Sequence, residues 1–179
     1  MNLILKYFQY NFIIFLFSSI IFCQEDLVGK KAYVFYSKTL DGDNFLLSEI
    51  IEKDKPIFIN FFATWCSPCI EELPLLNDFY LKNKNSLEMI IIDVNNLSII
   101  ENNLPIKLPE DPVLAQKILA KNNISFTSLF DKYAFIARQY GVSNLPHSVL
   151  IKDGIIIWEG KKKLTNFSLN NLKPLIEDD

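Results

Sequence analysis

The sequence predicts an α/β fold with a central mixed sheet flanked by helices, and three observations support this. Residues 57–62 form an apolar run interrupted only by Asn60, which is typical of a strand buried on both faces. Residues 66–82 follow helical spacing and residues 87–94 form a second apolar run, so the three segments predict a parallel βαβ unit. An Asp-Gly turn at residues 153–154 lies between two apolar segments and predicts an antiparallel hairpin, which makes the sheet mixed.

Length, composition and charge limit the classes of function. The chain has 179 residues, of which 50% are hydrophobic, and this suits one compact domain with a sizeable core. Its formal net charge is −3, and Arg138 is its only arginine. No basic stripe could therefore follow a phosphate backbone, and we expect no nucleic-acid partner.

Residues 1–23 have the features of a targeting segment. They contain one charged side chain, Lys6, followed by an apolar run over residues 12–22. The run is shorter than the roughly 20 residues of a membrane span and suits a secretory signal peptide cleaved after Cys23. Two alternatives stay open: acylation of Cys23, although the residue before it is not the usual small one, and an uncleaved anchor. All three place the predicted domain, residues 24–179, outside the cytoplasm, with membrane contact only through such an anchor or lipid.

An N-terminal β-hairpin extension is predicted before the central strand. Residues 32–37 are rich in β-branched and aromatic side chains, residues 40–43 contain turn signals, and residues 44–47 return as a short strand. Residues 48–53 are expected to form a brief helical turn. Pro56 then begins the central strand, where its missing N–H removes no central ladder hydrogen bond.

The helix after the central strand contains Pro74. A proline inside a helix removes a backbone hydrogen bond and crowds the preceding turn, so we expect a kink there. The apolar face of this helix consists of Ile70, Leu73, Leu76, Phe79 and Tyr80.

A further helix and a short strand are predicted after the second strand. Residues 95–110 are polar and interrupted by prolines, which predicts a long surface loop with at most one helical turn. Asp111 is expected to cap a helix that has Pro112 in its first turn. Residues 124–130 then predict a short strand.

The C-terminal part is predicted to contain two further helices beside the hairpin. Asp131 is expected to cap a helix over residues 132–140, and a last helix covers residues 168–176, with Pro174 inside it. The three lysines at residues 161–163 are expected to form a solvated loop and not a binding patch.

Two cysteines follow the central strand at the spacing Cys-x-x-Cys. Pro68 suits the first turn of a helix, which places Cys66 at the helix N-terminus. Unpaired N–H groups and the positive end of the helix dipole favour a thiolate there, and the thiolate is the reacting species in disulfide exchange. Cys66 is therefore the predicted nucleophile. Cys69, one turn later on the same side, is the predicted resolving cysteine.

Two structural interpretations of this cysteine pair are less favourable. A disulfide that closes a four-residue loop restricts the unfolded chain by only about 2 kcal/mol in the entropy model. A closed zinc site needs four Cys or His ligands, whereas the chain has three cysteines and a single histidine, His147. We expect no metal and no cofactor.

The motif and its surroundings resemble the TlpA/ResA-like thioredoxins. The run Trp65-Cys66-Ser67-Pro68-Cys69, with Glu72 and Pro74 after it, is similar to the W-C-x-P-C-x-x-E-x-P signature of that family. The resemblance extends from about Val28 to the C-terminus and implies a thioredoxin-like fold. It includes Asn60, Tyr140-Gly141-Val142, Leu145-Pro146 and Asp153-Gly154. The helix and strand between Asp111 and Phe130 resemble the central insertion of that family.

The resemblance also implies where an extended substrate would bind. Pro146 is expected to be a cis proline next to the disulfide, with the backbone of Leu145 pairing with substrate, and Trp65 completes the expected binding set. His147 departs from the family pattern, in which a small hydroxyl residue is more usual. It could tune the dithiol, but we expect it to face solvent at a strand end.

Glu72 is the best candidate for moving protons. It lies three residues beyond Cys69, on the same helical face, and leans back toward the dithiol. Thioredoxins commonly have a buried aspartate in the preceding strand, whereas this chain has Asn60, which cannot titrate. The alternative is an exposed acid on the helix surface.

The predicted function is that of an exported thiol–disulfide oxidoreductase. The resemblance implies a monomeric reductase that is regenerated by a membrane thiol–disulfide donor. Its protein disulfide substrates would be apocytochromes c or other exported proteins with wrongly formed disulfides.

Two other functions are alternatives to this one. A thiol peroxidase of the same fold would have proline at position 59 and serine or threonine at position 63, where this chain has Ile59 and Ala63. A non-catalytic module would use the groove at Pro146 to hold extended peptides without redox turnover. Such a module would still bind its partners after both cysteines were replaced.

Overall fold

The computed structural model describes residues 26–94, 100–101, 104–105 and 112–177. The predicted signal peptide, the alternatives of lipidation at Cys23 and an anchor, and the predicted cap Asp111 lie outside the described residues. Within the described ranges, no helix is both long and apolar enough to cross a lipid bilayer.

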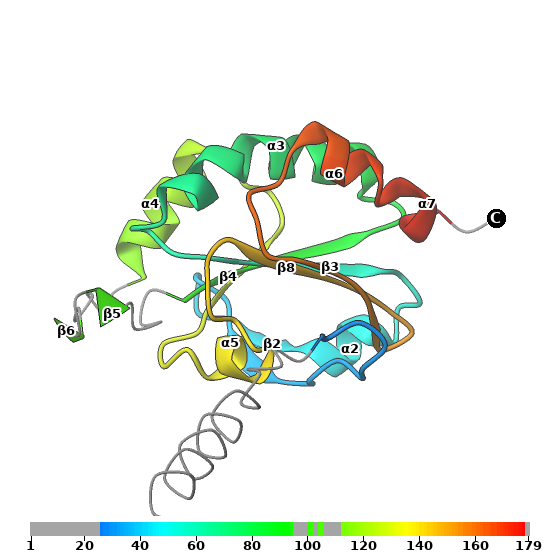
Figure 1. The fold of residues 1–179 in the computed structure, drawn as a ribbon, viewed down its shortest axis with the longest axis horizontal. Coiled ribbons are helices and arrows are strands. Elements are labelled where there is room, and N and C mark those ends of the chain that lie inside the picture. Colours follow the sequence, from blue (N-terminus) through cyan, green and yellow to red (C-terminus); the bar gives the residue numbers. More distant parts are fainter. Residues whose placement is uncertain (1–25, 95–99, 102–103, 106–111, 178–179) are drawn as a thin grey trace, which may run out of the picture.

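A five-stranded mixed sheet forms the centre of the molecule, in the order β7-β4-β3-β8-β9 (Figure 1). The central strand β3 lies parallel to β4, which lies parallel to β7, whereas β8 runs antiparallel to both β3 and β9. All six residues of β3 are buried, as expected for a strand covered on both faces. The strands are β3 (Ile57–Phe62), β4 (Glu88–Asp93), β7 (Thr127–Phe130), β8 (His147–Lys152) and β9 (Ile155–Gly160).

Helices cover both faces of this sheet, and each face has its own hydrophobic core (Figure 1). One face carries α3 (Ser67–Asn83), α4 (Val113–Lys121), α6 (Asn166–Asn170) and α7 (Lys173–Ile176). The other face carries α2 (Leu47–Ile51) and α5 (Phe135–Gln139). Alternate residues of β3 serve the two cores: Phe58 and Phe62 face α3, whereas Ile59 and Phe61 face α5.

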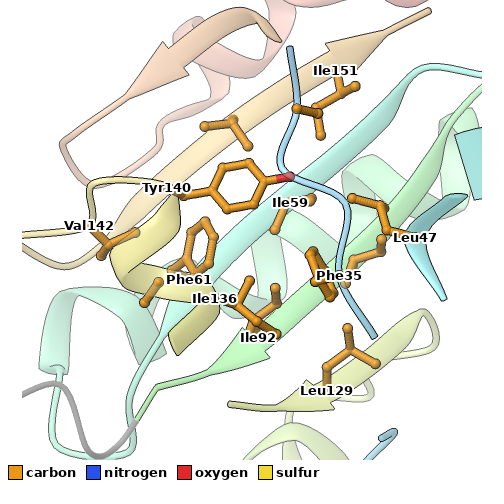
Figure 2. Close-up of a cluster of buried hydrophobic side chains, with 14 of the residues drawn as sticks. Phe35, Leu47, Ile59, Phe61, Ile92, Leu129, Ile136, Tyr140, Val142 and Ile151 are labelled. Atoms are coloured by element: carbon orange, nitrogen blue, oxygen red, sulfur yellow. The ribbon is translucent and has the colours of Figure 1, made fainter. Parts of the chain in front are cut away.

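The N-terminal segment, here residues 29–40, crosses the sheet on the α5 side and covers both edges of the sheet. At the β9 edge, Gly29 N–H donates to Ile156 O at 2.8 Å, and Ile156 N–H donates to Lys30 O at 2.9 Å. Phe35 then packs into the core beneath the sheet, where Tyr140 donates its hydroxyl hydrogen to Tyr33 O at 2.9 Å (Figure 2).

A small hairpin completes this crossing at the opposite edge. It pairs β1 (Tyr36–Lys38) with β2 (Asn44–Leu46), and Leu40 N–H donates to Ser128 O of β7 at 2.8 Å. The predicted N-terminal hairpin is therefore confirmed. Its first strand is shorter than the expected 32–37, because residues 29–35 pair with β9 and then cross the core.

Several helix and strand boundaries differ from the predictions. The last helix is divided into α6 and α7, with Pro174 in the first turn of α7. The predicted loop 95–110 contains two short paired strands, β5 (Ile100–Glu101) and β6 (Leu104–Pro105). The strand predicted over 124–130 is confined to Thr127–Phe130. Pro74 lies within α3, which continues past it to Asn83.

Asp131 is not the N-cap residue, as was expected for a helix over 132–140, because α5 begins at Phe135 and its N-cap is Ala134. The Asp131 carboxylate nevertheless bonds to the first amides of this helix. It accepts hydrogen bonds from Phe135 N–H at 2.8 Å and Ala137 N–H at 2.9 Å. Burial raises the pKa of Asp131 above its ordinary value, and these amide hydrogen bonds oppose that rise.

Candidate redox site

The two cysteines lie where the chain turns from β3 into α3. Cys66 is the N-cap residue, with φ −85° and ψ 95°, and Pro68 stands in the first turn of the helix. A disulfide joins Cys66 to Cys69, whose Cα atoms are 5.3 Å apart. The N–H of Cys69 donates to Sγ of Cys66 at 3.3 Å, so the helix N-terminus directs a donor at the predicted nucleophilic sulfur.

Glu72 lies three residues after Cys69 on α3 and is buried, with 1% of its surface exposed. Its Oε1 accepts a hydrogen bond from Nδ2 of Asn60 at 2.9 Å, and its Oε2 accepts one from the N–H of Leu164 at 2.7 Å. Burial raises the pKa of Glu72 above its ordinary value, and the two hydrogen bonds oppose that rise because they favour the carboxylate. The alternative of an exposed surface acid is therefore wrong for Glu72.

Its neighbour Glu71, in contrast, lies on the surface beside a lysine. Glu71 is exposed and pairs with Lys163, which holds the pKa of its carboxyl below the ordinary value. The hydroxyl of Ser67 also donates to Glu71, at 3.2 Å. Two consecutive carboxylates of α3 thus differ in burial and in the direction of their pKa shifts, because they lie about 100° apart around the helix.

A polar connection leads from Glu72 across the sheet. Nδ2 of Asn60 donates to Oγ of Ser148 on β8 at 3.0 Å, while Oδ1 of Asn60 has no hydrogen-bond partner among the described residues. The register Asn60↔Ser148 places these two side chains opposite each other. The sequence carried no signal for Ser148, nor for the backbone N–H of Leu164, because both depend on which strands and loops lie side by side.

The expected substrate-binding residues gather around the same core. Trp65 and Leu145 are half-buried and pack against the hydrophobic cluster that contains Cys66 and Cys69. The Leu145–Pro146 peptide bond is cis, as the resemblance implied, and Pro146 itself is buried.

His147 does not face solvent, and this expectation was wrong. Its side chain is only 2% exposed, because it belongs to β8 itself and points toward the α5-side core, where it meets Phe61 edge-on at 5.9 Å. Nε2 of His147 lies 3.1 Å from Oε1 of Glu159, without the geometry of a hydrogen bond. Desolvation lowers the pKa of His147 below its ordinary value, and the charge of Glu159 opposes this.

Two of the three lysines at residues 161–163 make specific contacts. Lys161 pairs with Glu159 at 3.1 Å, and Lys163 pairs with Glu71. All three are exposed, as expected for a solvated loop, but the loop is attached to β9 and α3 by these ion pairs. Among the described residues, no three His, Cys, Asp or Glu side chains are arranged to hold a metal ion.

Comparison with protein families gives a match over most of the chain. Residues 28–162 match the AhpC/TSA family. The thiol–disulfide oxidoreductase ResA of Bacillus thuringiensis subsp. konkukian is 33% identical over 144 residues, which are 79% of this chain and 74% of that protein. The thiol–disulfide oxidoreductase ResA of Geobacillus thermodenitrificans is 28% identical over 153 residues, which are 82% of this chain and 79% of that protein.

Solved structures agree on the fold. A putative thiol:disulfide interchange protein DsbE from Chlorobium tepidum superimposes with a TM-score of 0.66 at 24% identity, over 83% of this chain and 94% of that one. StoA from Bacillus subtilis gives 0.62 at 21% identity, over 82% and 98%. These likenesses establish a thioredoxin-like fold. With the sequence matches, they show that the chain belongs to the AhpC/TSA family and to its ResA-like thiol–disulfide oxidoreductases.

Proposed function

We propose that this protein is an exported thiol–disulfide reductase that acts through Cys66 and Cys69. The observation that carries the proposal is a Cys-x-x-Cys disulfide at the N-terminus of α3, with a buried carboxyl group, Glu72, three residues after Cys69 on the same helix. The helix N-terminus favours the thiolate needed for attack, and the buried acid can supply or accept a proton without contact with bulk water.

The reaction begins from the reduced dithiol. The Cys66 thiolate attacks one sulfur of a substrate disulfide, so that an S–S bond to Cys66 forms, the substrate S–S bond breaks, and the first substrate sulfur leaves as a thiolate that takes up a proton. The Cys69 thiol then loses its proton and attacks Cys66. The second substrate sulfur leaves and is protonated.

Two electrons and two protons have then passed to the substrate, and the protein holds the disulfide seen in the structure. A membrane thiol–disulfide donor would then return two electrons and two protons and so regenerate the dithiol. Glu72 would carry one of the protons, since its raised pKa keeps the carboxyl protonated to higher pH than an exposed glutamate.

Several parts of the proposal concern location and partners. Residues 1–23 would be a signal peptide, lipoprotein signal or anchor, and residues 24–179 would be the exported domain, present as a monomer. Trp65, Leu145 and Pro146 would bind an extended segment of a protein disulfide substrate. Apocytochromes c before haem attachment are one candidate class, and exported proteins with wrongly formed disulfides are the other.

The test is to trap the substrates on a Cys69→Ser variant. Without the resolving thiol, mixed disulfides at Cys66 persist and can be identified by mass spectrometry. A matched Cys66→Ser variant keeps Cys69, which is fully buried, and should trap nothing. Haem-binding proteins alone in the trap would support a role in cytochrome maturation. Equal trapping by the two variants would contradict the assigned roles, and an empty trap in cells that need the wild-type protein would contradict the redox function itself.

A further inference from the structure

The loop between β9 and α6 contacts two consecutive glutamates of the dithiol helix. On the surface, the ammonium group of Lys163 pairs with the carboxylate of Glu71. In the interior, the N–H of Leu164 donates to Oε2 of Glu72 at 2.7 Å. Adjacent residues of the loop therefore contact adjacent residues of α3, one pair exposed and the other buried.

The position of the Leu164 amide is fixed from both sides. The Leu164 side chain is 3% exposed and belongs to the same hydrophobic cluster as Cys66 and Cys69. The next residue, Thr165, caps α6 through a capping box with Ser168. The amide cannot move away from Glu72 unless this packing or the start of α6 is disturbed.

We infer that the backbone N–H of Leu164 is a positioning group for thiol–disulfide exchange, because it holds the carboxyl of Glu72, three residues after Cys69 on α3, and sets how readily that carboxyl releases its proton. This inference rests on the proposed function. A donor that faces a carboxylate stabilises its ionised form, whereas burial favours the neutral form. The pKa of Glu72 is therefore set by burial, which raises it, and by its hydrogen bonds, which lower it.

The loop carries three lysines, at residues 161–163. Lys161 pairs with Glu159, whereas the charge of Lys163 lowers the pKa of Glu72. Asn60 of β3 donates to Glu72, and it and Ser148 of β8 carry no charge. On α3 itself, the charge of Glu71 is paired with Lys163, and the cysteines are uncharged in the disulfide form.

The experiment replaces the Leu164 amide by an ester, through incorporation of the α-hydroxy analogue of leucine into the whole domain. The side chain is kept and only the N–H donor is lost. The same ester at Leu175 is the matched control, since its N–H donates to Leu172 O at 2.9 Å in the same C-terminal segment and does not touch Glu72. The titration of Glu72 is followed by the ¹³C shift of its carboxyl in the oxidised protein, assigned with Glu72→Gln.

The ester at Leu164 should raise the titration midpoint of Glu72 by roughly one to two pH units, the usual effect of losing a hydrogen bond to a charged group. The ester at Leu175 should leave the midpoint unchanged. The pH–rate profile for disulfide reduction should shift with the midpoint. Lys163→Gln should raise the midpoint by less than about one unit, because the Lys163 side chain is exposed, and Lys162→Gln should not move it.

An unchanged Glu72 midpoint in the Leu164 ester would overturn the inference, as would an equal shift in the Leu175 ester. A midpoint that shifts without any change in the pH–rate profile would also overturn it, since Glu72 would then not limit the exchange. The titration needs no turnover. If the wild-type protein reduced no disulfide, the proposed function would fall, while the titration would still decide whether the Leu164 amide controls Glu72.

Discussion

Glu71 and Glu72 show how much the environment of a single residue decides in this protein. The two carboxylates are adjacent in the chain, yet one is exposed and paired with Lys163, and the other is buried with two neutral donors. Their pKa values are shifted in opposite directions from the ordinary value. Of these two carboxyl groups, only that of Glu72 therefore keeps its proton at a pH where an exposed glutamate is ionised.

We expect Glu72→Gln to slow disulfide reduction by roughly 100-fold, the lower end of the usual contribution of a general acid or base. The fold should survive, because the side-chain amide has nearly the same shape. Oδ1 of Asn60, which has no partner among the described residues, can accept from the new NH₂ group if the Asn60 amide turns over. Turnover is measured with a model protein disulfide and a chemical reductant.

The stability of the Glu72→Gln variant has a defined pH dependence. Because the folded-state pKa of Glu72 is raised, its contribution to stability is present at low pH and is lost as the pH rises through that pKa. The variant should thus gain stability relative to wild type between pH 5 and pH 8 in urea unfolding. Glu71→Gln is the control, and similar turnover in the two variants would exclude a special role for Glu72.

At the scale of elements, the burial of His147 at the start of β8 is the main difference from the sequence-based expectation. His147 and Glu159 lie on the same face of the antiparallel pair β8 and β9, because Glu159 is opposite Val149 in the register. A diagonal pair of this kind brings the imidazole and the carboxylate together inside the α5-side core. Since the chain has one histidine, any titration of an imidazole can be assigned to this site.

We expect His147 to stabilise the folded protein less at pH 5 than at pH 7.5. Desolvation lowers the folded-state pKa of His147, so its contribution to stability is present above the unfolded pKa and is lost as the pH falls through the folded-state pKa. The contribution is about 1.4 kcal/mol for each unit by which the pKa is lowered. It is measured by urea unfolding of wild type and His147→Asn at both pH values.

The free energy of unfolding of His147→Asn, measured relative to wild type, should therefore be higher at pH 5 than at pH 7.5. Glu159→Gln should lower the pKa of His147 further, because the carboxylate opposes the effect of burial. Parallel pH profiles for wild type and His147→Asn would mean that the imidazole does not change its protonation on folding.

At the scale of the whole molecule, the N-terminal segment closes the fold. It pairs with β9 at one edge, contributes Phe35 to the core beneath the sheet, and reaches β7 at the other edge (Figure 2). Exposed edge strands can pair with other chains, and this segment covers the two edges of the central sheet.

We expect Phe35→Ala to reduce the free energy of unfolding by about 3–5 kcal/mol, as for other buried phenylalanines. Phe35 is 5% exposed, stacks on Phe45 at 5.9 Å and meets Tyr140 at 6.4 Å, so its removal leaves a cavity between the N-terminal segment and α5. Tyr36→Ala is the control, since Tyr36 is 59% exposed and should cost less than about 1 kcal/mol. Equal losses in urea unfolding would show that the crossing segment adds little to the core.

The sequence by itself determined the central βαβ unit and the dithiol at the start of α3. These features depend on local patterns: an apolar run for β3, helical spacing after Cys66, and a proline in the first helical turn. Glu72 could also be placed on the dithiol side of α3, because helix geometry fixes the direction of a side chain relative to its neighbours three residues away.

Only the tertiary structure decided what surrounds these groups. The amide of Leu164 reaches Glu72 across 92 positions of sequence, and Ser148 reaches Asn60 across 88. His147 is buried because β8 inserts beside β3 and the α5 side is covered by chain from the N-terminus. Burial and hydrogen-bond partners set the protonation of Glu72 and His147, and both arise from contacts between distant segments, which no local pattern of residues encodes.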